Sequence, residues 1–114
     1  MPIFAKWRKL ANLPKSRGRD AMPGIYEIAN YDKKIIYIGQ SAKDAPNRIR
    51  QHLQKENCIS DEAYYWRYEF SRIPKADEAN HIDSFLEENG KIPKCNKVTP
   101  IVRDILKRYS ERSQ

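Results

Sequence analysis

The sequence predicts an α+β domain in which a small three-stranded antiparallel sheet is flanked by helices. Residues 25–29 and 35–38 are rich in β-branched and aromatic side chains, and the polar stretch between them favours a turn. These two runs therefore predict a hairpin. Aromatic residues crowd the stretch 62–70, which predicts the third strand.

The helices are predicted from apolar residues that recur at intervals of three and four. Pro46 fits only the first turn of a helix, and Asp44 before it is a capping candidate. Gly90 marks the end of a later helix. The helical stretches expected on this basis are 4–11, 45–53, 77–86 and 100–109.

One face of the third strand is entirely aromatic. We expect it to be buried against helices, because each large ring removes on the order of 150 to 250 Å² from water. A platform on which nucleic-acid bases stack is the alternative interpretation. The side chains that share this face are Tyr64, Trp66, Tyr68 and Phe70.

The length of 114 residues suits one domain with one modest core. We expect a basic N-terminal helix and linker over 1–22, the core over 23–97, and a C-terminal helix over 98–114 that packs on the core. No apolar run approaches the roughly 20 residues that span a bilayer, and no signal peptide is evident, so a cytoplasmic protein without membrane contact is expected. Cys58 and Cys95 are too few for a disulfide framework and lack a zinc-binding spacing, so reduced thiols are expected.

The formal net charge of +7 favours a polyanionic partner, and nucleic acid is the first candidate. Basic side chains are frequent in the N-terminal stretch, where they are expected to contact phosphates or to form a solvated surface. Charge alone leaves both interpretations open, because many small proteins are basic for solubility.

The predicted hairpin carries two related tripeptides. Residues 24–26 read Gly-Ile-Tyr and residues 37–39 read Tyr-Ile-Gly. Tyrosines on paired strands are more often half-buried packing residues than functional groups. Two such tripeptides in this order and at this spacing, however, resemble the signature of the GIY-YIG nuclease superfamily. The resemblance implies the fold described above and a reaction in which a phosphodiester bond is hydrolysed.

The helix expected over 45–53 supplies two further matches. Ile49 and Leu53 form its inward stripe, and Arg48 and His52, which are also four residues apart, lie side by side on the adjacent flank. Taken alone, these would be a surface cation and a boundary histidine. The resemblance implies instead an essential arginine at Arg48 and a functional histidine at His52.

Glu78 lies one turn before Ile82 and so projects from the inward side of its helix. A carboxylate there is costly unless it is paired or bound to metal, although a helix N-terminus also favours negative charge. The resemblance implies that Glu78 holds one divalent ion, Mg²⁺ or Mn²⁺. It also implies that Asn96, in a short segment after Pro93, supports the active site.

The resemblance implies that Tyr26, together with Tyr37, orients or deprotonates the attacking water while Arg48 stabilises developing charge. A tyrosine with an ordinary pKa near 10 is a poor base, so Tyr26 and His52 both remain candidates for this role. The expected catalytic residues are Tyr26, Tyr37, Arg48, His52, Glu78 and Asn96. The expected nucleic-acid contacts are Gln40, Ser41, Lys43, Arg48 and Arg50, with Gln40 standing where many family members have lysine.

The resulting hypothesis is a stand-alone, metal-dependent DNA endonuclease. A non-catalytic nucleic-acid-binding module on the same fold and an RNA nuclease are the alternatives. No appended recognition domain is evident in the sequence, so we expect low sequence specificity or specificity borrowed from a partner. A monomer or weak dimer is expected.

Overall fold

The computed structural model describes residues 3, 5–14 and 22–112 of the chain. The expected α+β class is confirmed, and the sheet has four strands in the order β1-β4-β2-β3. Every neighbouring pair is antiparallel. The strands are β1 Arg8–Lys9, β2 Gly24–Ala29, β3 Ile35–Ser41 and β4 Tyr65–Phe70. The helices are α1 Ala45–Leu53, α2 Cys58–Glu62, α3 Pro74–Asn89 and α4 Pro100–Arg112, together with the short 3₁₀ helix η1 Leu10–Asn12.

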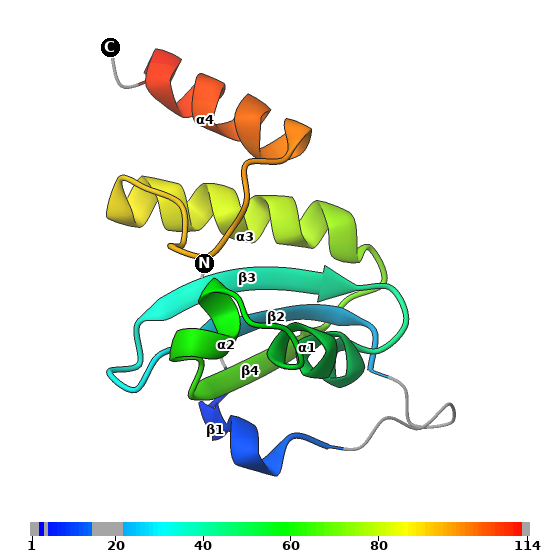
Figure 1. Ribbon diagram of the computed structural model, residues 1–114. Helices are drawn as coiled ribbons and strands as arrows, with labels where there is room; N and C mark the ends of the chain where they lie inside the picture. Colours follow the sequence, from blue (N-terminus) through cyan, green and yellow to red (C-terminus); the bar gives the residue numbers. More distant parts are fainter. Residues whose placement is uncertain (1–2, 4, 15–21, 113–114) are drawn as a thin grey trace.

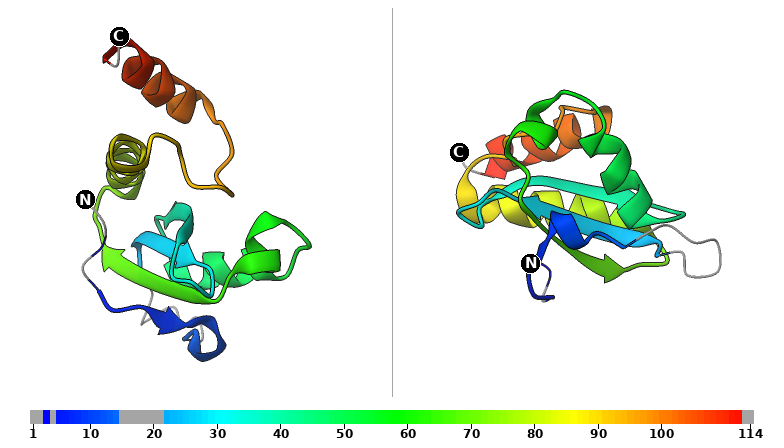
Figure 2. Two further views of the ribbon diagram at one scale, coloured as in Figure 1. Left: turned by 90° about the vertical axis from the view of Figure 1, so that its left-hand side faces the viewer. Right: turned by 60° about the horizontal axis from the view of Figure 1, so that its bottom comes forward.

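The sheet lies between two helical layers (Figures 1 and 2). Helices α1 and α2 cover one face, where Ile49 and Ile59 pack with Ile28 and Trp66. Helix α3 covers the other face, and α4 packs on the far side of α3. Their shared core contains the β3 residue Ile38 and the helical residues Ile82, Leu86, Val102 and Ile105. The helices expected over 45–53, 77–86 and 100–109 are therefore confirmed.

The helix expected over residues 4–11 is wrong. Arg8 and Lys9 pair with Trp66 and Tyr65 as a short fourth strand, and η1 follows it. The free edge of β4 offers unpaired backbone groups, and pairing with this segment satisfies them. Residues 15–21 of the expected basic linker lie outside the described residues.

The aromatic face of the third strand is only partly buried, which corrects the expectation. Trp66 is 1% exposed, but Phe70 at the end of β4 is 58% exposed. Tyr64 is 37% exposed, lies before β4 and makes an edge contact with the ring of Tyr31. Alternation in the sequence identifies the side chains on a common face, but not the length of strand that the helices cover.

Residues 91–97, here called the edge segment, run along the free edge of β3. The backbone N–H of Cys95 donates to the carbonyl oxygen of Ile36 at 2.8 Å. The side chain of Asn96 pairs with Ile38 twice: its Oδ1 accepts from the Ile38 N–H, and its Nδ2 donates to the Ile38 carbonyl oxygen, both at 2.9 Å. Thus one asparagine side chain completes the hydrogen bonding of an outer-strand peptide.

Cys58 and Cys95 form a disulfide, so the expectation of reduced thiols is wrong. The two cysteines are 37 residues apart in sequence, but the edge segment brings Cys95 beside the start of α2. Sequence spacing alone gave no sign of this proximity. No helix in the described part of the chain is long and apolar enough to cross a membrane.

Candidate active site

A cavity of about 360 Å³ opens between α1, β3, α3 and the edge segment. It collects side chains from four separate helices and from the sheet. Five of the six expected catalytic residues line it: Tyr37, Arg48, His52, Glu78 and Asn96. We call this cavity the catalytic pocket.

Tyr26, the sixth expected residue, lies behind the wall of the pocket and is fully buried. Its hydroxyl is 3.1 Å from Nε2 of His52, and its ring centre lies 6.1 Å from that of Tyr37, near enough for Tyr37 to affect its pKa. Tyr37 and His52 both line the pocket, whereas Tyr26 does not. Tyr37, Tyr26 and His52 therefore form one cluster of polar side chains, in which the buried Tyr26 lies beside the two residues that line the pocket.

Gly39 makes room for this cluster. It pairs with Tyr26 across the β2–β3 ladder. A Cβ at this position would lie 2.5 Å from the Cζ and hydroxyl oxygen of Tyr26 and 2.6 Å from Cε2 of Tyr37. Any larger residue would therefore displace one or both tyrosines. Gly39 thus leaves space for the two tyrosines, and β3 continues past it to Ser41.

The titratable groups of this cluster have displaced pKa values. Burial lowers the pKa of His52 to about 4, with smaller effects from the positive charges of Arg48, Lys55 and Lys97. Burial raises the pKa of Tyr26 well above its usual value, and the neighbouring Tyr37 adds to the effect. At neutral pH the imidazole is therefore neutral and able to accept a proton, while Tyr26 keeps its own proton.

Glu78 projects into the catalytic pocket from the first part of α3, beside the buried Ile82. Burial raises the pKa of its carboxyl group to about 7. Among the residues that the structure describes, none forms a hydrogen bond or ion pair with this carboxylate. A half-buried oxygen donor without a partner among the described residues is suited to a hard divalent cation, which prefers oxygen ligands.

The described residues contain no cluster of three or more His, Cys, Asp or Glu side chains that could hold a metal ion. Glu78 is thus a single carboxylate. Mg²⁺ is commonly held by one or two carboxylates, with water and substrate phosphate as its other ligands. The donor set therefore fits an ion that binds together with a phosphate, rather than a permanently caged one.

Arg48 is exposed at the mouth of the pocket, where its Nη1 donates to Oε1 of Gln51 at 3.1 Å. Two further cations, Lys55 and Lys97, also line the pocket, and sequence reasoning missed both. Lys55 lies three residues after His52, just past the end of α1, and Lys97 follows Asn96, so closeness in sequence to the expected residues was the available signal.

The other expected nucleic-acid contacts lie away from the pocket lining: Gln40, Ser41, Lys43 and Arg50. The side chain of Arg50 donates to the carbonyl oxygen of Pro14. Ser41 Oγ accepts the backbone N–H groups of Lys43 and Asp44, which shapes the turn before α1. Asp44 occupies the N-cap position but caps nothing there with its side chain, which accepts from the N–H of Met22.

The comparisons with known proteins agree with the hairpin motif. A family model described as the GIY-YIG catalytic domain matches residues 22–76. Flagellar hook-associated protein 1 of Buchnera aphidicola subsp. Schizaphis graminum (strain Sg) is 25% identical over 68 residues, which are 60% of this chain and 12% of that protein. The chain thus spans about an eighth of the length of this relative. No solved structure matches the chain significantly.

The family match includes both tripeptides and the helix that carries Arg48 and His52, and it ends just before Glu78. Glu78 and Asn96 join the site through the fold, because α3 and the edge segment return to β3. Members of this family are generally endonucleases, which act on nucleic acid. The signature residues, the match over residues 22–76 and the α+β architecture support a nuclease-type GIY-YIG domain in this chain.

Proposed function

We propose that the protein is an endonuclease that uses a divalent metal ion, Mg²⁺ or Mn²⁺, to hydrolyse phosphodiester bonds in DNA. The observation that carries this proposal is the composition of the catalytic pocket. It combines a neutral histidine, a carboxylate without a partner among the described residues and an arginine that forms no ion pair with any of them, on a nuclease-type fold. Proton acceptance, metal binding and phosphate stabilisation are the three requirements of this reaction.

His52 is the better candidate for the final proton acceptor. A phenol whose pKa is raised by burial cannot hold a negative charge readily, whereas the imidazole of His52 is unprotonated at neutral pH and can take up a proton transiently, even though burial lowers its pKa to about 4. In the proposed step, water gives a proton to Tyr37 as Tyr37 passes its own to Tyr26, and Tyr26 passes its proton to Nε2 of His52. Each tyrosine ends with as many protons as it began with. The shared path therefore avoids a stable phenolate.

The remaining pocket residues position the phosphate. Arg48, at the mouth, pairs with a non-bridging oxygen and stabilises the charge that develops there. Glu78 would hold the divalent ion, which would supply positive charge to the phosphate and the leaving oxygen. Asn96 contributes indirectly, because its two hydrogen bonds fix the Ile38 peptide next to Tyr37.

The reaction is tested by incubating the purified protein with supercoiled plasmid, branched DNA and RNA, in Mg²⁺ or Mn²⁺ and in EDTA. We expect cleavage of DNA with either metal and none with EDTA. Cleavage of RNA alone would identify an RNA nuclease, and binding without cleavage under every condition would support the non-catalytic module.

The proton path is tested with Tyr37→Phe, which removes one hydroxyl without opening a large cavity. Cleavage should fall by about 10² to 10⁴-fold, the usual contribution of acid–base catalysis. Tyr31→Phe is the matched control, since Tyr31 is 71% exposed and lies outside the catalytic pocket. Equal rates for the two variants would remove Tyr37 from the chemistry.

A further inference from the structure

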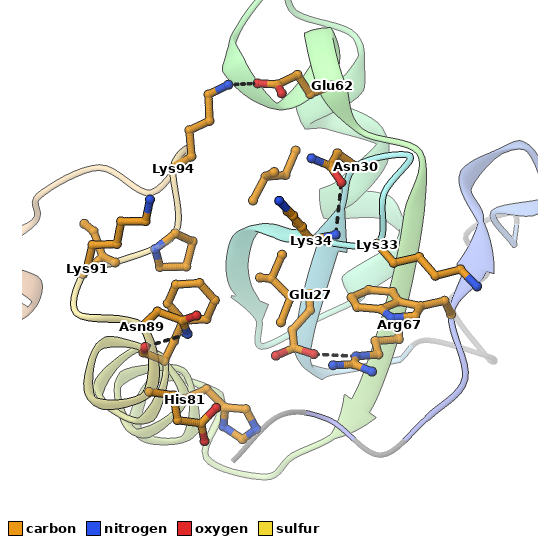
Figure 3. A pocket seen from close by; sticks show the side chains of 17 residues that line it. Glu27, Asn30, Lys33, Lys34, Glu62, Arg67, His81, Asn89, Lys91 and Lys94 are labelled. Carbon is orange, nitrogen blue, oxygen red and sulfur yellow. Dashed lines mark hydrogen bonds and ion pairs between the residues drawn. The ribbon is translucent and has the colours of Figure 1, made fainter.

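A second cavity, of about 670 Å³, lies between α3 and the sheet and contains none of the expected catalytic residues. Figure 3 shows its two walls. Lys33 and Lys34 lie on the β2–β3 turn, and Lys91 and Lys94 lie on the edge segment across from them. We call this space the lysine cavity.

The lysine cavity has an excess of positive charge. Five cationic side chains and three carboxylates line it. Two of these carboxylates are already paired within the protein, Glu27 with Arg67 and Glu62 with Lys94. Lys34 and Lys91 are exposed, and their ammonium groups form no hydrogen bond or ion pair with any described residue. These two lysines are therefore available to an anionic ligand.

Between the two lysine walls, the lining contains half-buried apolar and aromatic surface from Trp7, Ile35, Phe85 and Ile92. The guanidinium of Arg67 lies 3.9 Å from the ring centre of Trp7 and is thereby held in place. Apolar surface bordered by cations suits a polymer that presents phosphates at regular intervals beside flat bases. A small anion would leave most of a cavity of this size unfilled.

The edge segment links the lysine cavity to the catalytic pocket. Lys91 and Lys94 line the former, and Lys97 lines the latter. On β3, Ile36 lines the lysine cavity and the next residue, Tyr37, lines the catalytic pocket. An extended chain spans at most about 3.5 Å per residue, so Lys91 and Lys97 lie within about 20 Å of each other. This distance equals the rise of roughly six nucleotides in one strand of a duplex.

We propose that the lysine cavity is a second subsite for the nucleic acid that the enzyme cleaves, holding its backbone several nucleotides from the scissile phosphate. The lysines of the edge segment guide the strand between the two cavities. This inference rests on the proposed function for the identity of the ligand. It adds a binding site that lies outside the catalytic machinery and sets a minimum substrate length.

The test uses Lys34→Gln/Lys91→Gln, which keeps side-chain length similar while removing two charges. Its control is Lys107→Gln/Arg108→Gln, an equal charge change at exposed positions of α4 that line neither cavity. Affinity for DNA duplexes of about 6 and about 20 base pairs is measured in EDTA by fluorescence anisotropy over a range of salt concentrations. For the long duplex, each lost phosphate contact should reduce the slope of log affinity against log salt by about 0.9.

We expect the lysine variant to lower that slope by about 1.8 with the long duplex and by clearly less with the short duplex, which is barely long enough to reach both cavities. The control variant should change neither slope to this extent. An equal loss with both duplexes, or an equal loss in the control, would show that only overall charge matters and would overturn the proposal. If the lysine variant shows the length-dependent loss of binding but the wild-type protein never cleaves, the proposed reaction is refuted and the subsite is retained.

Discussion

Each cavity contains a carboxylate withdrawn from solvent, Glu27 buried and Glu78 half-buried, and the two have different surroundings. Glu27, in the lysine cavity, is 1% exposed, lies 2.6 Å from Nε of Arg67 and also accepts from the backbone N–H of Ile3. Glu78, in the catalytic pocket, has no partner among the described residues, and its pKa is raised to about 7. A charge that is paired within the protein joins parts of the fold, whereas a charge without a protein partner remains available to a ligand.

The same contrast extends to the neighbouring side chains. Around Glu78, burial displaces the pKa values of His52, Tyr26 and Tyr37. Groups shifted in this way are concentrated at functional sites, because catalysis needs protonation states that isolated side chains lack. The smaller cavity is therefore the stronger candidate for chemistry, and the larger one is suited to binding.

The largest effect is expected from Glu78→Gln, which keeps size but removes the charge that a hard cation requires. Single-turnover cleavage should fall by at least about 10² to 10³-fold, while DNA binding without metal stays equal or becomes slightly tighter. A variant that cuts at the wild-type rate would place Glu78 outside the active site.

Melting temperature gives an independent measurement on the same variant. The pKa of Glu78 is higher in the folded state than its ordinary value of 4.5, so its unfavourable contribution to stability grows from about pH 4.5 to pH 7 and is complete above pH 7. Relative to wild type, Glu78→Gln should therefore be more stable at pH 8 than at pH 5. A helix-dipole role for Glu78 would give the opposite sign, with a loss of about 0.3 to 1 kcal/mol.

Glu27→Gln should give the reverse pattern. Removing one member of a buried pair leaves Arg67 without its counter-charge, and such changes typically cost about 3 to 5 kcal/mol of unfolding free energy. The amide oxygen still accepts from Arg67, so we expect a value near the lower end. Chemical denaturation measures the loss, and cleavage per folded molecule should stay near the wild-type rate. A stable but inactive variant would contradict the structural role of Glu27.

Gly39→Ala tests how closely the two tyrosines are packed. The added methyl group cannot fit beside Tyr26 without movement, and overpacking of this kind costs about 1 to 3 kcal/mol. A displacement of the tyrosines by about 1 Å should also lower cleavage by about 10²-fold. Thermal melts and rates at a temperature where the variant is folded separate the two effects. Full activity would show that the tyrosine positions are not critical.

The smallest expected effect is a pH dependence of about tenfold per pH unit. Below about pH 7, protonation of Glu78 competes with metal, so cleavage should rise with pH and level off above it. His52, with a pKa near 4, stays neutral over this range and adds no second slope. Raising the Mg²⁺ concentration should move the midpoint to lower pH. If the midpoint does not shift with Mg²⁺ concentration, the titration belongs to a group other than Glu78.

Local patterns in the sequence predicted much of the fold and grouped several of the site residues. Arg48 and His52 share a helix flank because they are four residues apart, and Glu78 shares a side with Ile82 for the same reason. The periods of helix and strand are properties of neighbouring residues, so a single sequence contains them.

Features that depend on distant contacts could not be predicted in this way. The β1 strand exists because β4 has an open edge, and the disulfide exists because the edge segment returns to α2. Burial of Tyr26 behind the pocket wall depends on α1 and Gly39 together. The lysine cavity likewise unites a turn, a helix and the edge segment, which no local pattern connects.

The Cys58–Cys95 disulfide has a consequence for proteolysis. It encloses β4 and α3, including Glu78, in a covalent loop closed across 37 positions. A protease that cuts once within this loop leaves a single molecule of unchanged mass apart from one added water. Cleavage there is invisible in a denaturing gel without reductant and visible once thiol is added. Paired gels with and without reductant would therefore report directly whether α2 and the edge segment are joined in the purified protein.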